Sequence, residues 1–287
     1  MLKTDEYGSS YIDFVKMHGA GNDYIYIDAV SDPASMPDDP NTLSVKISDR
    51  HFGVGSDGLV VIMPSEVADF RMRMFNADGS EAQMCGNATR CIGKFVYDRG
   101  LTRKREVTLE TLSGIKVLSL HVGDDDRVRS VTVDMGLPHV EGEVEMVSEG
   151  KTFRAVSVNV GNPHGVVFID EAPDDALVLG HGPRLECAPC WPEKANIEFL
   201  HVIAPHEADA RVWERGIGET LACGTGACAT AVAALLTERA ASPVNIKLPG
   251  GSLQIEWQPG GSVYMSGPAR TVYQGEITLA WASEAAN

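Results

Sequence analysis

The sequence predicts a mixed α/β protein of two related domains, each with many short strands around one long helix. Its 287 residues suit two domains, because a domain usually holds about 100–200 residues. Blocks of the first half recur in the second half in the same order, which indicates a duplicated domain. Short β-rich runs bounded by Gly, Pro, Asp and Ser are typical of strands, as at 58–63, 70–75, 107–109 and 128–134.

The repeat is strongest around two cysteines. Residues 74–86 align without gaps with residues 212–224, which places Cys85 opposite Cys223 at an offset of 138. Three further blocks keep nearly the same offset and the same order. Gly21-Asn22 corresponds to Gly161-Asn162 (offset 140), Val61–Pro64 to Val202–Pro205 (141), and 107–109 to 244–246 (137). Chance similarity among strand-like runs explains each block singly but not their order.

One long helical pattern follows the Cys-Gly pair in each half. It covers 87–99 in the first half and the Ala-rich stretch 225–239 in the second. We expect a first domain over 1–134 and a second over 135–270. Two segments rich in Pro, Gly and acidic residues, 136–151 and 170–194, read as connections.

The composition excludes several classes of function. The net charge is −16 and no Lys/Arg-rich run interrupts it, so nucleic acid is a poor partner. No stretch approaches the roughly 20 apolar residues of a membrane-spanning helix. The N-terminal residues carry no apolar core of a signal peptide. We therefore expect a cytoplasmic protein whose six cysteines are reduced.

Two of these cysteines are placed for catalysis. Cys85 and Cys223 each stand at a strand-to-helix turn, and each precedes a glycine. A helix start carries unpaired N–H groups and a partial positive charge, which stabilise a thiolate and also bind a carboxylate. Two thiols on opposite sides of one carbon, one ionised and one protonated, can invert a stereocentre by proton transfer. The pattern predicts such a transfer beside a carboxylate.

The other four cysteines have simpler explanations. Cys91 and Cys228 fall inside the two helices and are expected to be inert core residues. Cys187 and Cys190 form a CxxC pair, which raises the alternative of a thiol-redox or zinc-binding protein. A structural zinc needs four ligands, so we interpret this pair as incidental and expect no metal. No Rossmann or phosphate-binding motif is present and no lysine suggests pyridoxal phosphate, so no cofactor is expected.

Four stretches together resemble the diaminopimelate epimerase family: 19–23, 75–87, 161–164 and 214–226. The resemblance runs from about Phe14 to Ile277 in the expected order. It implies two domains related by a pseudo-twofold axis, each a many-stranded sheet wrapped around a central helix. It also implies that the final strand, from Thr271 to the end at 287, returns to the first domain.

The resemblance further implies the reaction and the residues of the site. The family interconverts LL- and meso-2,6-diaminopimelate without a cofactor, on the route to lysine and peptidoglycan. By motif, Cys85 and Cys223 are its acid/base residues, and His164 and Glu214 flank and tune them. Tyr273 matches a position associated with homodimer contact. The implied substrate-binding residues are Asn22, Asn76, Gly86, Asn87, Asn162, Asn196, Glu214, Arg215, Gly224 and Thr225.

Alternatives remain beside this interpretation. An Asn after Gly is usually a turn residue, and a lone Arg is usually a surface charge. Proline and hydroxyproline racemases also use paired cysteines, but they place His after Cys-Gly where this chain has Asn87. The phenazine-pathway isomerase lacks both thiols. Some diaminopimelate epimerases carry Gln after the aspartate where this chain has Gly58, so one polar contact is expected to be absent or made by water.

Overall fold

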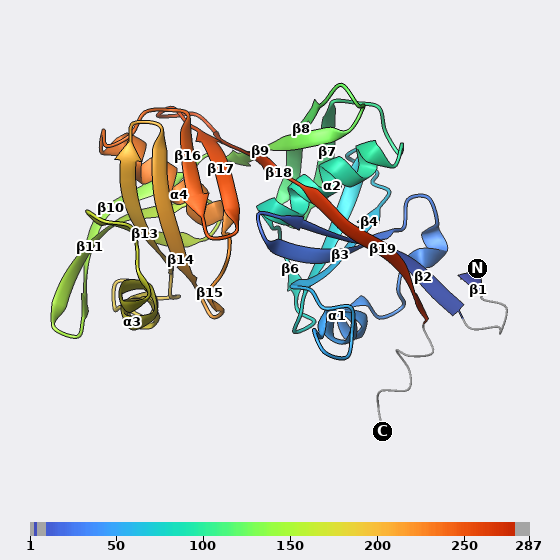
Figure 1. The fold of residues 1–287 in the computed structure, drawn as a ribbon, viewed down its shortest axis with the longest axis horizontal. Coiled ribbons are helices and arrows are strands. Elements are labelled where there is room, and N and C mark those ends of the chain that lie inside the picture. The colour runs from blue at the N-terminus through green and yellow to red at the C-terminus, as the bar shows by residue number, and fades with distance from the viewer. Residues whose placement is uncertain (1–2, 5–9, 279–287) are drawn as a thin grey trace. The chain divides into compact units, whose positions relative to one another are not determined.

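The computed structural model describes residues 3–4 and 10–278 and divides the chain into two compact units. Unit 1 comprises residues 1–131 and 268–287, and unit 2 comprises residues 132–267 (Figure 1). The outermost parts of the expected first domain, at 1–2, 5–9 and 279–287, lie outside the described residues. Within the described part, no helix is long and apolar enough to cross a membrane.

Unit 1 is built on seven strands in the order β19-β2-β3-β4-β5-β7-β8. The β3–β4 and β5–β7 pairs are parallel, and the other neighbouring pairs are antiparallel. Short strands β1 (Lys3–Thr4) and β6 (Glu81–Ala82) pair with β2 and β5. The chain leaves the unit through β9 (Val128–Gly136). The seven strands are β19 (Arg270–Thr278), β2 (Ser10–Gly19), β3 (Asn22–Asp28), β4 (Gly58–Met63), β5 (Phe70–Asn76), β7 (Glu106–Thr111) and β8 (Gly114–Val122).

Unit 2 repeats this topology with its own strands. Its order is β10-β11-β12-β13-β14-β16-β17-β18, with parallel pairs at β12–β13 and β14–β16 only. The short β15 (Gly218–Glu219) pairs with β14, as β6 does with β5. The same succession of orientations in both units confirms the duplication. The strands are β10 (His139–Ser148), β11 (Lys151–Asn159), β12 (Pro163–Phe168), β13 (Asn196–Ala204), β14 (Glu207–Glu214), β16 (Val244–Leu248), β17 (Gly251–Glu256) and β18 (Val263–Pro268).

Each unit has one central helix that is buried on nearly every face, α2 (Gly86–Asp98) and α4 (Gly224–Leu236). Strands of its own unit surround each helix (Figure 1). A helix that is buried all round belongs to a core, and α4 meets this need with alanines. The predicted helices therefore exist and begin one residue earlier than expected. The residues at their N-caps are Cys85 and Cys223.

The expectation of one helix per half was wrong. Helix α1 (Pro40–Ser48) packs Leu43 and Ile47 against the sheet of unit 1, and α3 (Asp175–Glu186) packs Val178 and Leu185 against that of unit 2. Helix α1 has only nine residues, and α3 contains Pro183, so their helical signal is weak. The segments interpreted as connections accordingly contain α3 and the strand β10. Strand β10 was missed because six of its ten residues are exposed and three of these are glutamates, which are uncommon in strands.

The strand register corrects one block of the repeat. Val61 pairs with Arg73 in unit 1, and Phe199 pairs with Arg211 in unit 2. Val61 therefore corresponds to Phe199 rather than to Val202, and the offset stays at 138 through this region. Strand β13 is longer than β4, and the turn after it is correspondingly shorter. The same register makes Gly58 the counterpart of Asn196.

Candidate active site

The thiol of unit 1 lies at the start of α2, where Cys85 has an extended backbone with φ −136° and ψ 121°. Its side chain does not cap the helix; instead Cys85 Sγ donates to Asn22 Oδ1 at 3.3 Å. Gly86 and Asn87 form the first turn, whose N–H groups point beyond the helix end. Asn22, Gly86 and Asn87 are thus brought together around this sulfur.

Two amides and two charged groups form a chain beside Cys85. Arg90 Nη2 donates to Asn87 Oδ1 at 2.8 Å, and Asn87 Nδ2 donates to Asn22 Oδ1 at 3.3 Å. Asn22 Nδ2 in turn donates to Asp57 Oδ2 at 2.7 Å. Arg90 is fully buried, and its guanidinium also bonds the carbonyl of Gly86. A cation and a carboxylate therefore stand at opposite ends of the two amides.

The thiol of unit 2 makes the opposite kind of hydrogen bond. Cys223 caps α4, because its Sγ accepts from the backbone N–H of Gly226 at 3.3 Å. The Thr225 hydroxyl lies 3.4 Å from the same sulfur. Cys223 is 6% exposed. One sulfur thus donates to a carbonyl oxygen, and the other accepts from a helix-start N–H.

A buried polar cluster surrounds His164, which is fully inaccessible. Its Nδ1 lies 2.6 Å from Glu198 Oε1, and its Nε2 lies 2.9 Å from Asn162 Oδ1. Asn196 Nδ2 lies 3.4 Å from His164 Nδ1, while Asn196 Oδ1 accepts from the backbone N–H of Arg215 at 2.7 Å. His164 is therefore fixed on both ring nitrogens, and Asn196 fixes the backbone at Arg215.

Glu214 couples this cluster to Cys223. Burial raises the pKa of the Glu214 carboxyl, and hydrogen bonds from Thr220 and Cys223 together with the nearby His164 oppose that shift. Burial also raises the pKa of the Cys223 thiol well above its ordinary value, and the carboxylates of Glu214 and Glu198 act in the same direction. The protonated thiol is therefore the stable form of Cys223.

Three expected site residues make other contacts. Arg215 is exposed, and its Nη1 donates to the Glu193 carbonyl at 3.0 Å. Asn76 lies at the end of β5, and its side chain donates to Ser80 Oγ at 3.0 Å within its own turn. Tyr273 is 43% exposed on β19, and its ring packs edge-on against Phe14 at 5.9 Å between centroids.

Gly58 leaves no room for a side chain on the present backbone. A Cβ at this position would lie 2.0 Å from the carbonyl oxygen of Phe75 and 2.9 Å from the Tyr24 ring. A glutamine at this position would therefore need a local backbone shift. The counterpart position in unit 2 carries Asn196, so the two units differ here in polar groups.

The remaining cysteines differ in their surroundings. Cys91 is fully buried and burial raises its pKa to about 11, and Cys228 is also fully buried. Cys187 is exposed at the end of α3, whereas Cys190 is partly buried, which raises its pKa. Among the described residues, no three His, Cys, Asp or Glu side chains cluster as a metal site would require.

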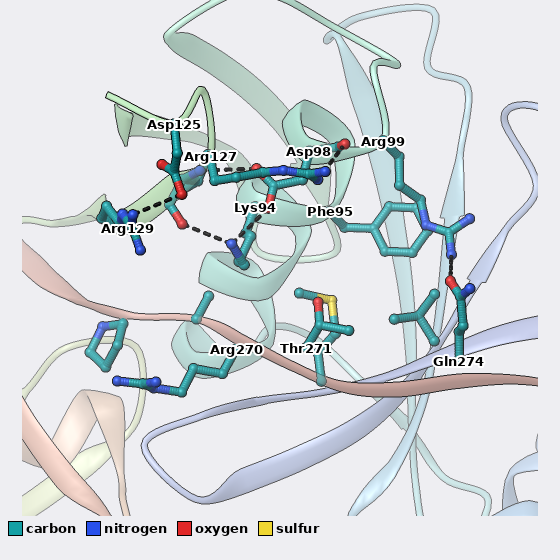
Figure 2. A pocket seen from close by; sticks show the side chains of 15 residues that line it. Lys94, Phe95, Asp98, Arg99, Asp125, Arg127, Arg129, Arg270, Thr271 and Gln274 are labelled. Carbon is teal, nitrogen blue, oxygen red and sulfur yellow. Dashed lines mark hydrogen bonds and ion pairs between the residues drawn. The ribbon is translucent and has the colours of Figure 1, made fainter. Parts of the chain in front are cut away.

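A pocket of about 690 Å³ in unit 1 lies at the other end of α2 from Cys85 (Figure 2). Most of its charged groups bond one another or the backbone. Lys94 Nζ bonds Asp98 Oδ2 at 2.6 Å and the Val128 carbonyl at 2.8 Å, and Arg99 donates to Gln274 at 3.0 Å. These contacts tie the helix end to β9 and β19. None of the expected site residues lines this pocket.

Three buried or half-buried charged residues of these clusters were missed from the sequence: Asp57, Arg90 and Glu198. Glu198 shares a strand face with Asn196, two residues earlier, in an otherwise mostly apolar strand. Arg90 follows Asn87 by three residues and therefore lies on the same side of α2. A charge in a segment that must be buried was the signal available for both.

Comparison with known proteins gives consistent matches along most of the chain. The sequence profile described as diaminopimelate epimerase matches residues 14–141 and 156–272. A diaminopimelate epimerase of Parabacteroides distasonis is 51% identical over 93% of this chain and 98% of its own length. One from Methanococcus maripaludis is 48% identical over 93% and 99%.

Solved structures share the fold at low sequence identity. A probable proline racemase from Agrobacterium radiobacter gives a TM-score of 0.72 at 14% identity over 93% of each chain. A phenazine biosynthesis protein of the PhzF family from Bacillus anthracis gives 0.70 at 17% identity, over 93% of this chain and 99% of its own. These matches confirm the mixed α/β fold class predicted from the sequence.

Proposed function

The chain belongs to the diaminopimelate epimerase family, and we propose that it interconverts LL- and meso-2,6-diaminopimelate with two cysteines and no cofactor. As a member of this family it is an isomerase. The observation that carries the proposal is that each unit places one cysteine, Cys85 or Cys223, at the N-cap of its central helix. The route to lysine and peptidoglycan is the biosynthetic setting that this reaction serves.

In the proposed mechanism the two thiols serve opposite faces of the substrate α-carbon. One enters as thiolate and takes the α-proton, and the other enters as thiol and returns a proton to the opposite face. The C–H bond breaks on one side as the new one forms on the other, and the charges of the two sulfurs exchange. The raised pKa of Cys223 supports its entry as the thiol, with Cys85 as the base.

The helix starts supply the binding site for the reacting carboxylate. The first turns at Gly86-Asn87 and Gly224-Thr225 present N–H groups that suit an anion and that stabilise negative charge as the proton leaves. Asn22 and Asn162 add polar groups beside the sulfurs. The remaining substrate contacts are assigned to Asn76, Asn196, Glu214 and Arg215, with Arg215 for the distal carboxylate.

His164 and Glu214 tune the reaction without touching the transferred proton. Burial raises the pKa of both Glu214 and Cys223; the nearby His164 opposes the shift at Glu214, and the Glu214 carboxylate adds to the shift at Cys223. We further propose that the enzyme works in the cytoplasm as a homodimer, with Tyr273 at the contact. The exposure of Tyr273 and of Val272 on β19 supports that assignment. Sedimentation of wild type and Tyr273→Ala tests it, and a monomeric wild type would contradict it.

Solvent isotope labelling tests the two-thiol reaction. In D2O, two monoprotic thiols should place deuterium mainly in the inverted product, because the base that takes the substrate proton does not return it to the same face. Early and equal labelling of substrate and product would refute the mechanism. Cys85→Ser and Cys223→Ser should each abolish epimerisation, whereas Cys187→Ser should leave it at the wild-type rate.

Proline or hydroxyproline racemisation is the second candidate function. It is supported only at the level of fold, by structures of 14–15% identity. Asn87 stands where those racemases carry His, and Arg215 offers a cation that a substrate with one carboxylate does not need. Assays on diaminopimelate isomers beside L-proline separate the two, and turnover of proline alone would overturn our assignment.

A further inference from the structure

The orientation of two amides beside Cys85 is set by the charged groups at their ends. A guanidinium has only donors, so Arg90 Nη2, 2.8 Å away, requires Asn87 to turn its oxygen toward it. The NH2 group of Asn87 therefore faces Asn22 and donates to Asn22 Oδ1 at 3.3 Å. Arg90 thus favours the orientation in which the Asn22 side chain turns its oxygen, and not its NH2 group, toward Asn87 and Cys85.

Asp57 imposes the same orientation from the other end. Its Oδ2 accepts from Asn22 Nδ2 at 2.7 Å and from the backbone N–H of Asp23 at 3.0 Å, while Arg50 bonds its Oδ1 at 2.9 Å. An ionised carboxylate can only accept, so the NH2 group of Asn22 must point toward Asp57. A reversed Asn22 would turn its oxygen toward that carboxylate and its NH2 group toward the NH2 group of Asn87.

The locked amide presents an acceptor to the catalytic sulfur. Cys85 Sγ donates to Asn22 Oδ1 at 3.3 Å, which a thiol can do and a thiolate cannot. The start of α2 and the cation of Arg90 favour the thiolate, so the amide opposes them. Tyr26 and Cys91 are further titratable groups of unit 1 whose pKa is raised by this sulfur, in addition to the larger effect of burial.

We propose that Asp57 is a positioning residue for Cys85: through Asn22 it keeps a carbonyl oxygen against the sulfur, which holds the Cys85 proton more tightly than the helix start alone would. The importance of this effect for catalysis rests on the proposed function, in which Cys85 transfers a proton. Proton transfer that must run in both directions works best between two thiols of similar acidity. Because burial favours the protonated form of Cys223, strengthening Cys85 as a base narrows the difference between them.

The test compares Asp57→Asn with Asp23→Asn in the full-length protein. Both variants remove one negative charge from adjacent carboxylates, but the side chain of Asp23 bonds Lys16 and Arg50 and not Asn22. Iodoacetamide labelling of Cys85 is followed against pH by peptide mass spectrometry. An asparagine at 57 can donate or accept, so the variant removes one of the two constraints on Asn22. Only the Arg90–Asn87 pair then opposes a turn of the Asn22 NH2 group toward a thiolate.

In Asp57→Asn we expect the labelling midpoint of Cys85 to fall by about one pH unit, a tenfold gain in thiolate fraction at a given pH. Asp23→Asn should shift it much less. Equal shifts in both variants would show that loss of a nearby negative charge explains the change, and would overturn the proposal. An unchanged or raised midpoint of Cys85 in Asp57→Asn would overturn it as well. Asp57→Ser, whose hydroxyl also donates or accepts, is the second variant if Asp57→Asn does not fold.

The pH profile of kcat/KM gives a readout that a purely structural role would not move. Its acidic limb, in the direction where Cys85 is the base, should shift to lower pH with the labelling midpoint, while kcat falls because the thiolate is a weaker base. If wild type epimerises diaminopimelate but the midpoint does not move, this inference fails alone. If the midpoint moves and no epimerisation occurs, only the proposed function fails.

Discussion

Replacing Gly226 by alanine tests how closely α4 packs around the thiol of unit 2. A Cβ at this position would lie 2.8 Å from Glu198 Oε1 and 3.3 Å from Cys223 Sγ. Glu198 is only 1% exposed and holds His164 at 2.6 Å, so its carboxylate has little room to withdraw. The added methyl group should therefore displace the sulfur, the carboxylate or the first turn of the helix.

The size of the effect follows from two opposing terms. Alanine in place of glycine in a helix gains about 1 kcal/mol. Forcing a methyl group into a packed site costs about 1–3 kcal/mol. The free energy of unfolding of Gly226→Ala should thus lie about 0–2 kcal/mol below that of wild type. A shift of the Cys223 sulfur should also lower kcat/KM by at least about tenfold, because small misplacements of reacting groups are costly.

Gly180→Ala in α3 is the matched control. It lies in the same unit, and a Cβ there meets nothing within 4 Å, so it should gain about 0.5–1 kcal/mol and keep full activity. Urea unfolding and steady-state epimerisation measure both variants. A Gly226→Ala protein as stable and as active as Gly180→Ala would show that the thiol environment of unit 2 is looser than these distances indicate.

Three further predictions concern charged residues. Arg215→Met should lower kcat/KM on diaminopimelate at least about tenfold, since a hydrogen bond to a charged group is worth about 1.5–3 kcal/mol. The exposed control Arg154→Met should keep the wild-type kcat/KM, and equal values in the two variants would remove Arg215 from the site. Because burial raises the pKa of Glu214 in the folded state, ionisation costs stability as the pH rises through that value. Glu214→Gln should therefore gain stability over wild type on titration from about pH 4 to about pH 8, and a gap that narrows would contradict this sign. Asp98→Ala removes the carboxylate that accepts from the Lys94 ammonium and the Val128 N–H, so its free energy of unfolding in urea should fall by about 1–3 kcal/mol. A fall below about 0.5 kcal/mol would be inconsistent with these contacts.

The architecture of two related units was predictable because the sequence contains the repeat twice. A single copy of the Cys-Gly pattern would have indicated only a strand-to-helix turn, but two copies in ordered blocks required two units of one design. The helix starts were one residue off, since Cys85 and Cys223 are N-caps whose role depends on backbone geometry. The lengthening of β13 was invisible in the sequence, because apolar strand residues align equally well at an offset of 138 or 141.

The charged neighbours of the thiols were harder to predict. Asp57 follows a Gly-rich stretch and reads as a turn residue, and its role becomes visible only when β3 and β4 run parallel and bring Asn22 within 2.7 Å. Glu198 reads as an outward-facing strand residue, yet α4 packs against it and His164 of the neighbouring strand β12 pairs with it. Such partners come from long-range packing, which periodicity along one strand does not encode.

The differences between the two units match what an epimerase needs from a duplicated fold. The repeat supplies one cysteine sulfur in each unit, as the proposed two-thiol inversion needs. Diaminopimelate has only one distal end, however, so a residue for that end should occur in one unit only. By strand register, the position equivalent to Arg215 in unit 1 is Ala77, and the position equivalent to Glu214 is Asn76. The cation and the buried carboxyl therefore occur at these positions in unit 2 only. If Arg215 binds the distal carboxylate, replacing Ala77 by arginine should not rescue Arg215→Met, because the second cation would lie in the wrong unit.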